Sequence, residues 1–299
     1  MVIVRLLGGF GNQMFQYATA RHIAVLNKTI VKIDLSGFDK KQYKKGDTYR
    51  ELKLNAFKLK AETATIEEID RVRKYKPSIF KQIKSRLLQN YTSIFSKPEL
   101  YEKELFCFDP TVLKAPSNSY LTGYWQSPKY FDSIRTILLK DFEFRENPTK
   151  VDYPYLNNIQ QGNSVSIHIR RGDYVSNPEY FKIHGLCSLE YYQSAIEYIC
   201  RKIENPVFYI FSDDMDWVKK NIQLKETSFY VTDTPSGKDY FEMHLMSLCK
   251  HNIIANSSFS WWGAWLNQNS KKIVIAPKQW MKDPTIDTTD LIPVNWIRI

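Results

Sequence analysis

A histidine, two arginines and an aspartate stand at the end of an apolar, β-branched run near the middle of the chain. The run is Val165–Ile169 and contains His168; Arg170, Arg171 and Asp173 follow at once. This pattern predicts a buried strand that ends in a loop, which is where parallel α/β sheets bind ligands. Because guanidinium groups bind phosphate oxygens in pairs, the segment indicates a phosphate or pyrophosphate site with a carboxylate base nearby. The alternative is a turn with two surface arginines.

Glycines separate the first predicted strand from the first predicted helix. The segment Gly8–Gly11 lies between an apolar run at 2–7 and a helical pattern over about 12–27. Such a turn lets the backbone approach a ligand closely, and the helix N-terminus that follows favours anions. Asn12 is predicted to cap this helix. The third glycine of a dinucleotide fingerprint is missing, which argues against NAD, and a purely structural turn is the alternative.

Small hydroxyl residues and an aromatic helix follow the apolar run that ends at Asn256. Ser258, Phe259 and Ser260 precede three tryptophans. Free backbone N–H groups and hydroxyls at a helix start form a second phosphate cradle. The tryptophans are interpreted as packing residues rather than as a platform for a sugar.

Three aspartates end another apolar run. Asp213 is interpreted as a partner for a guanine or a ribose. Asp214 and Asp216 precede or open a predicted helix, where carboxylates offset the helix dipole. The alternative is that Asp214 and Asp216 form an acidic pair that binds a metal ion. The capping interpretation is favoured, so no metal site is predicted.

Strand and helix patterns alternate in both halves of the chain. A strand, a helix and a second strand occupy residues 2–35, which predicts a parallel sheet. In the second half, strands are predicted at 165–170, 207–212, 229–232, 252–255 and 273–276, and helices at 188–203, 215–221, 239–249 and 261–267. A stretch at 145–163 with Pro and Asn resembles a linker. The predicted fold is therefore α/β, with two Rossmann-like domains, 1–150 and 151–299, facing a cleft.

The charge of the chain is concentrated in its first half. Residues 1–150 hold 27 Lys and Arg against 16 Asp and Glu, whereas residues 151–299 hold 15 against 16. A nucleic-acid binder that used its whole length would not show this division. Residues 71–86 carry seven basic and no acidic residues among apolar ones, which indicates either a solvated helix face or a surface for an anionic membrane. Four unpaired cysteines and the absence of a signal peptide or an apolar span predict a cytoplasmic protein.

Three sequence blocks together resemble the α-1,2-fucosyltransferases of glycosyltransferase family 11, in particular the bacterial members. They read GGFGNQMFQYATAR at 8–21, HIRRGDYV at 168–175 and NSSFSWWGAWL at 256–266; FSDD at 211–214 and MSLCKHNIIA at 246–255 add to the likeness. The pattern of the second block is shared with α-1,6- and protein O-fucosyltransferases, so it specifies fucosyl transfer more than linkage. The region from about 39 to 135 matches no block.

This resemblance implies an inverting transfer of L-fucose from GDP-β-L-fucose, without a metal or other cofactor, to the 2-hydroxyl of a terminal β-galactose. It implies an α/β fold of GT-B type, with the acceptor site mainly in the first domain and the donor site in the second. The acceptor would be a surface glycan, a galactose-ended oligosaccharide or a lipid-linked glycan. The enzyme would be cytoplasmic, with peripheral contact at the inner face of the membrane as a further expectation. Nucleic acid is not expected as a partner. One alternative is a fucosyltransferase of another linkage, or another nucleotide-sugar transferase in which Asp214 and Asp216 bind a metal ion. The other is a non-enzymatic basic protein that binds nucleic acid or membrane.

The resemblance also distributes roles among the residues named above. Arg170 would bind the β-phosphate, and Asn12 would meet the reacting centre from the acceptor side. The remaining donor-site residues would be Gly11, His168, Arg171, Asp213, Asn256, Ser258, Phe259 and Ser260. For Arg171 the alternative is a salt bridge that holds the loop. Asp173 is the first choice for the general base and Glu179 the second; a very dissociative reaction would need little base assistance.

Overall fold

The computed structural model describes residues 1–43, 48–74, 98–149, 153–235 and 237–299. The chain divides into two compact units, which we call unit 1 and unit 2. Unit 1 is Met1–Glu143 with Thr289–Leu291, and unit 2 is Phe144–Thr288 with Ile292–Ile299. The predicted boundary at residue 150 is therefore displaced to 143, because Phe144 already stacks on His244 of unit 2, with ring centroids 4.2 Å apart.

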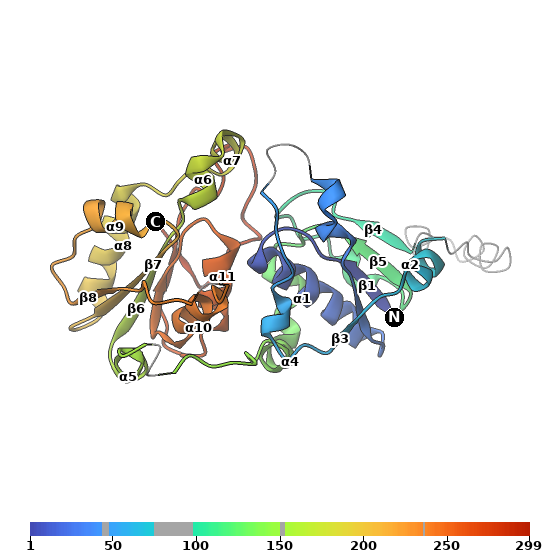
Figure 1. Ribbon diagram of the computed structural model, residues 1–299, viewed down its shortest axis with the longest axis horizontal. Helices are drawn as coiled ribbons and strands as arrows, with labels where there is room; N and C mark the ends of the chain where they lie inside the picture. Colours follow the sequence, from blue (N-terminus) through green and yellow to red (C-terminus); the bar gives the residue numbers. More distant parts are fainter. Residues whose placement is uncertain (44–47, 75–97, 150–152, 236) are drawn as a thin grey trace. The chain divides into compact units, whose positions relative to one another are not determined.

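Unit 1 is built on a five-stranded sheet in the order β3-β2-β1-β5-β4 (Figure 1). Every pairing of these strands is parallel. The elements are β1 (Val2–Arg5), α1 (Phe10–Leu26), β2 (Val31–Asp34), β3 (Ala61–Thr63), α2 (Ile66–Arg73), β4 (Glu99–Tyr101), β5 (Ser119–Thr122) and α4 (Arg135–Asp141). Short 3-10 helices occupy Ser36–Phe38, Lys40–Gln42, Leu54–Ala56, Val112–Lys114, Pro128–Tyr130 and Asp132–Ile134. The chain runs outward from β1 to β3 and then returns to the other side of β1.

Unit 2 contains a six-stranded sheet in the order β11-β10-β9-β6-β7-β8, again with parallel pairings throughout. Its strands are β6 (Ser164–Ile169), β7 (Val207–Ser212), β8 (Ser228–Tyr230), β9 (His251–Ile253), β10 (Val274–Ala276) and β11 (Ile297–Arg298). Its helices are α5 (Leu156–Gln161), α6 (Gly172–Ser176), α7 (Pro178–His184), α8 (Leu189–Lys202), α9 (Met215–Asn221), α10 (Tyr240–Leu248) and α11 (Ser258–Leu266). Both units thus have the Rossmann-like form that the alternating pattern predicted, and the α/β fold class with two Rossmann-like domains is confirmed.

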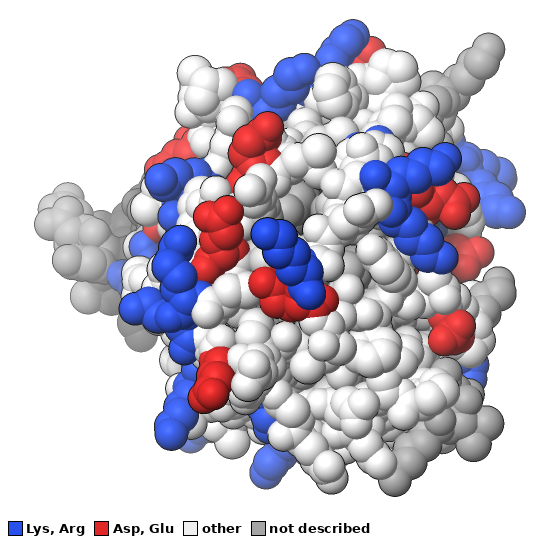
Figure 2. All heavy atoms as spheres, turned by 90° about the vertical axis from the view of Figure 1, so that its left-hand side faces the viewer, with Lys and Arg blue, Asp and Glu red and all other residues white. Residues whose placement is uncertain are grey.

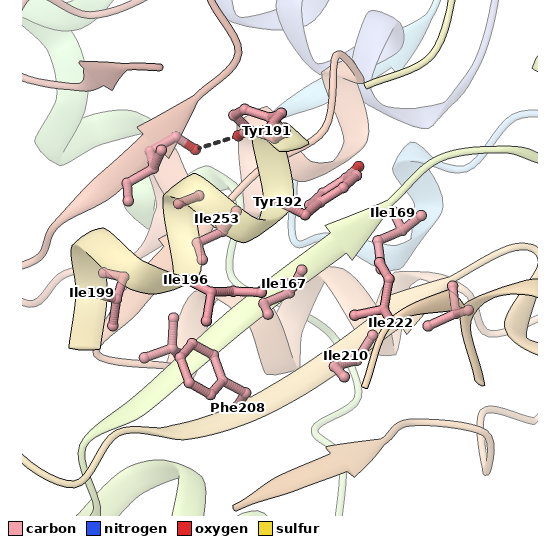
Figure 3. Close-up of a cluster of buried hydrophobic side chains, with 14 residues drawn as sticks. Ile167, Ile169, Tyr191, Tyr192, Ile196, Ile199, Phe208, Ile210, Ile222 and Ile253 are labelled. Carbon is pink, nitrogen blue, oxygen red and sulfur yellow. Dashed lines mark hydrogen bonds between the residues drawn. The ribbon is translucent and has the colours of Figure 1, made fainter. Parts of the chain in front are cut away.

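The core of unit 2 explains why its strands could be predicted from the sequence. All six residues of β6 are buried, because helices cover both faces of a parallel sheet. Figure 3 shows side chains of α8 lying over those of β6 and β7. The Tyr191 hydroxyl, at the edge of this cluster, donates to the carbonyl oxygens of Ile254 and Ile275, at 2.6 and 3.2 Å. The buried Tyr191 hydroxyl is therefore hydrogen-bonded to backbone oxygens of the neighbouring β9 and β10 segments.

Two helix starts differ from the prediction. Helix α1 begins at Phe10 with Gly9 as its N-cap, so the prediction that Asn12 caps it is wrong; Asn12 is the third helical residue. Helix α11 begins at Ser258, ahead of the predicted Trp261. In both places, small residues begin the helix before the apolar pattern becomes visible. Among the described residues, no helix is long and apolar enough to cross a membrane.

One face of unit 2 has mixed charge. Figure 2 views the end of Figure 1 that carries α8, α9 and β8, and basic and acidic side chains are interspersed there among uncharged ones. This agrees with the near balance of charged residues in 151–299. The basic stretch at 71–86 is described only up to residue 74, and its remainder lies outside the described residues.

Candidate active site

The topology of each unit identifies the edge at which a ligand can bind. In unit 2 the chain leaves β6 in one direction toward β7 and later returns to β9 on the other side of β6. In parallel α/β sheets, ligands bind beyond the carboxyl ends of the strands at such a switch point. Arg170 follows β6 and Asn256 follows shortly after β9. The two sequence blocks that indicated phosphate binding therefore meet at one place.

Arg170 is the centre of an ionic cluster at this switch point. Its guanidinium pairs with Asp173 through Nη2 and with Asp213 through Nη1, the latter at 2.7 Å. It also lies 5.5 Å from the centre of the Tyr174 ring. Burial alone would lower the pKa of Arg170, but the two carboxylates raise it above its usual value. Because the side chain is still 22% exposed, a fixed and permanently charged fork is presented at the strand ends.

Arg171 and the acids after β7 hold the loop that carries Arg170. The Arg171 backbone N–H donates to Asp213 at 2.8 Å, and its Nε donates to Asp214 at 3.0 Å. Its guanidinium lies over the Trp217 ring, 3.7 Å from the centroid. Asp214 also caps α9 by accepting from the Trp217 N–H. Asp214 therefore caps a helix, as predicted, and anchors an arginine as well.

A steric requirement explains why residue 172 is a glycine. A Cβ built on it would lie 2.4 Å from an Asp213 carboxylate oxygen. Only glycine lets the Arg170–Arg171 loop approach Asp213 this closely. The predicted guanine or ribose partner, Asp213, thus already contacts both arginines with its two oxygens.

His168 lies just below this cluster. It is 3% exposed, and burial lowers its pKa to about 4, so the ring is neutral at physiological pH. Its Nδ1 has no hydrogen-bond partner among the described residues, and its ring lies 5.6 Å from that of Phe259. A buried polar atom without a partner is uncommon and indicates a place for a ligand or an ordered water.

The N-terminus of α11 supplies a second group of donors. Ser257 caps the helix by accepting from the Phe259 N–H at 3.3 Å. Ser258, Phe259 and Ser260 form the first helical turn, whose N–H groups have no acceptor within the helix. The Ser260 hydroxyl donates to the carbonyl oxygens of Ala255 and Ser257. The N–H group of Phe259 is thus taken by Ser257, and the prediction that Ser258, Phe259 and Ser260 provide backbone amides to a donor stays a prediction.

Asn256 is occupied in holding the site together. Its Nδ2 donates to the carbonyl oxygens of His184 and Trp280, at 2.9 and 3.2 Å, and its Oδ1 accepts from the Cys187 thiol. His184 stacks on Tyr174 at 4.7 Å. Asn256 thereby ties the segment that carries α6 and α7 to the end of β9.

The two candidates for the general base have different environments. The Asp173 carboxylate pairs with Arg170 and is mostly buried. Glu179 lies in the first turn of α7, where its carboxylate is 73% exposed and pairs with Lys182 at 2.8 Å. Among the described residues, no group of three or more His, Cys, Asp or Glu side chains could hold a metal ion.

The corresponding switch point of unit 1 lies between β1 and β5. Gly8, with φ +77°, follows β1, and the turn at 123–126 follows β5. Asn12 accepts a hydrogen bond from Gln126 Nε2 at 2.7 Å. Gly11, predicted as a ligand contact, is buried inside α1. No sequence motif pointed to Gln126, because its contact with Asn12 depends on two strands that are distant along the chain.

Two further glutamines hold the glycine turn in place. Gln16 exchanges hydrogen bonds with the backbone of Leu7, at 3.1 and 3.2 Å. Gln13 donates to the carbonyl oxygens of Gly8 and Glu51 and accepts from the Lys53 N–H. Both side chains are fully buried. In the sequence, the available signal for these two residues was their spacing. Gln13 and Gln16 are three positions apart, so two amide groups lie on one face of a helix that is otherwise largely apolar on its buried side.

Two Rossmann-like units in one chain, with an arginine fork and a helix N-terminus at a switch point, are typical of GT-B glycosyltransferases, and the comparisons identify this chain as a glycosyltransferase. The family model described as glycosyl transferase family 11 matches residues 1–299. The chain belongs to that family.

Three curated relatives show its range. The chain is 36% identical to an α-1,2-colitosyltransferase of Escherichia coli, over 100% of this chain and 99% of the relative. It is 34% identical to the O-antigen biosynthesis glycosyltransferase WbnK of Escherichia coli, over 92% of this chain and 93% of the relative. It is 27% identical to galactoside α-(1,2)-fucosyltransferase 2 of Pongo pygmaeus, over 49% of this chain and 44% of the relative.

Proposed function

We propose that this glycosyltransferase moves L-fucose from GDP-β-L-fucose to the 2-hydroxyl of a terminal β-galactose, with inversion at the sugar carbon. The observation that carries the proposal is the arrangement at the unit 2 switch point, where Arg170 and the first turn of α11 follow adjacent strands. The similarity to a galactoside α-(1,2)-fucosyltransferase supports both the sugar and the linkage.

A second candidate differs only in the donor sugar. The relative at 36% identity over the whole chain is named for colitose and for an α-1,2 linkage. Colitose is L-fucose without its 3-hydroxyl, so one site could accept either sugar. A pocket that hydrogen-bonds the 3-hydroxyl would reject colitose strongly, whereas a pocket that leaves it unbound would discriminate weakly.

The proposed chemistry requires stabilisation of the leaving diphosphate. As the bond between the sugar and GDP breaks, negative charge grows on the β-phosphate. Arg170 is proposed to meet that charge with the N–H groups that its two aspartates leave unused, and the amides of Ser258 and Ser260 would do the same from the α11 N-terminus. Arg171 and Asp213 would keep this fork fixed, so that little reorganisation is needed during the reaction. No metal ion takes part in this proposal.

The acceptor hydroxyl must lose a proton as it attacks. Asp173 is proposed as the base, since it belongs to the same loop as Arg170. In that role the Asp173 carboxylate would give up part of its ion pair with Arg170 when the diphosphate binds to Arg170. It could then accept the proton of the acceptor hydroxyl. Glu179 is the alternative base, free of burial but paired with Lys182.

The acceptor is proposed to be a galactose-ended oligosaccharide or lipid-linked glycan. One relative is named for O-antigen biosynthesis, which supports a surface-glycan acceptor. The basic stretch at 71–86 is proposed to hold the enzyme at an anionic membrane surface on the cytoplasmic side.

One experiment tests the donor, the acceptor and the linkage together. The purified chain is incubated with GDP-fucose or GDP-colitose and a panel of β-galactosides, in the presence of EDTA, and the product linkage is determined by NMR. We expect an α-1,2-linked fucoside. A product with colitose alone would establish the second candidate, and activity that disappears in EDTA and returns with Mn²⁺ would refute the metal-free mechanism.

A further inference from the structure

The turn after β5 is held by a carboxylate rather than by secondary structure. Glu102 accepts from the backbone N–H groups of Tyr124 and Trp125, at 2.6 and 2.9 Å. A Cβ on Gly123 would lie 2.4 Å from the Glu102 Cβ, and Trp125 is buried with φ +57°. A buried non-glycine residue in the left-handed region costs free energy, so the surrounding contacts must impose this turn.

The consequence of this turn is the position of Gln126. Its side chain is 9% exposed, and its Nε2 donates to Asn12 Oδ1 at 2.7 Å. The hydrogen bond occupies the acceptor side of the Asn12 amide and so decides which way the amide faces. The donor side, Nδ2, then lies beside Gly8, where an added Cβ would approach it to 2.9 Å. Among the described residues, no acceptor is recorded for this Nδ2.

We infer that Gln126 is a positioning residue that turns the two N–H donors of Asn12 toward a hydroxyl of the acceptor sugar. The inference rests on the proposed function, because it assigns Asn12 to the sugar that receives the transferred residue. The physical reason is that an amide turned the other way presents an oxygen, which cannot donate to the sugar oxygen. A free Asn side chain would also have to be ordered on every binding event, which weakens binding.

The structure also explains why this pairing occurs at all. Gly8 follows β1 and Gln126 follows β5, the two strands that flank the switch point of unit 1. Switch points bind ligands because the loops on either side diverge and leave backbone and side-chain groups accessible. Asn12 is partly exposed, whereas its neighbours Gly11 and Gln13 are buried. The Asn12 amide is therefore a polar group that this edge offers to a ligand.

A double-mutant cycle tests the inference. Gln126→Met keeps the length of the side chain and removes the donor, and we expect it to lower kcat/KM for the acceptor about tenfold. In an Asn12→Ala background the same substitution should change kcat/KM less than about twofold, because there is no amide left to orient. Equal losses in both backgrounds would overturn the inference.

A second variant distinguishes orientation from packing. Gln126→Glu replaces the donor by a carboxylate, which would accept from Asn12 Nδ2 and turn the donors away from the sugar. We expect a loss at least as large as that of Gln126→Met, with unchanged affinity for GDP in calorimetry, since the proposed donor site lies in unit 2. Wild-type kinetics for Gln126→Glu would refute the role.

Two further measurements separate the inference from the proposed function. Gln193 on α8 is exposed, and its side-chain amide is hydrogen-bonded to Glu197. The matched control is therefore Gln193→Met, which should leave kcat/KM unchanged. Wild-type protein is assayed first. Absence of transfer to every sugar of the panel would overturn the proposed function together with this inference, whereas wild-type transfer with additive variants would overturn the inference alone.

Discussion

Glu242 makes the stability of unit 2 dependent on pH near neutrality. It lies in the first turn of α10. Its pKa is raised to about 7, mainly by burial and to a smaller extent by Asp239 and Asp213, while a hydrogen bond with Thr234 opposes the rise. Among the described residues, no Lys or Arg forms an ion pair with it. The charged form is therefore disfavoured in the folded protein.

The sign follows from proton binding in the two states. Between the usual glutamate pKa near 4.5 and about 7, the folded state holds a proton that the unfolded state has lost. The contribution of Glu242 to the free energy of unfolding is thus fully present below pH 4.5 and is lost as the pH rises through about 7. A shift of this size corresponds to about 3 kcal/mol in total, of which about 2 kcal/mol falls between pH 5.5 and pH 8.

The perturbation is Glu242→Gln, which keeps the shape and removes the titration. Urea unfolding followed by tryptophan fluorescence at pH 5.5 and pH 8 gives the free energy of unfolding of both proteins. We expect the wild type to lose about 2 kcal/mol more than the variant over this interval, and the variant to be the more stable protein at pH 8. Parallel pH dependence of the two proteins would show that burial of Glu242 does not control its ionisation.

Other predictions concern the ionic cluster and the basic stretch. Arg170→Ala should reduce kcat/KM more than tenfold, a loss of about 1.4 kcal/mol or more, and Arg170→Lys should not restore it, because a single ammonium cannot bridge Asp173 and Asp213; retention of a tenth of wild-type activity would contradict this. Gly172→Ala should lower the Tm, since its Cβ would clash with Asp213 at 2.4 Å, costing about 1–3 kcal/mol; an unchanged Tm would show that the loop relaxes freely. The protein should co-sediment with anionic vesicles at low salt through residues 71–86 and be released at high salt; binding to neutral vesicles alone would exclude the electrostatic role.

Some helix and strand predictions held and others did not, for physical reasons. The strand at 207–212 and the helix at 215–221 were predicted with the bounds that the structure shows, because an apolar run and a capped helix are local signals. In contrast, β4 and β5 were not predicted. They pair with each other and with β1 from a region where the sequence has no clear period, so their formation depends on the sheet that is already there.

The sequence by itself determined the chemistry at the ends of the strands: an arginine pair after β6, hydroxyl and aromatic residues after β9, and a glycine turn after β1. These signals are local, since strand, turn and helix-cap preferences extend over a few residues. The likeness to family 11 could be read from the same blocks, and the comparisons confirm it.

Only the tertiary structure decided the partners of these residues. Strand pairing places Asp213 of the loop after β7 against Arg170, and the return of the chain to β5 places Gln126 against Asn12. Asp213 and Gln126 are far along the chain from the residues that they contact. The sequence in between does not predict either contact. Chain crossover and sheet register fix such contacts, because they bring the ends of non-consecutive strands to the same edge.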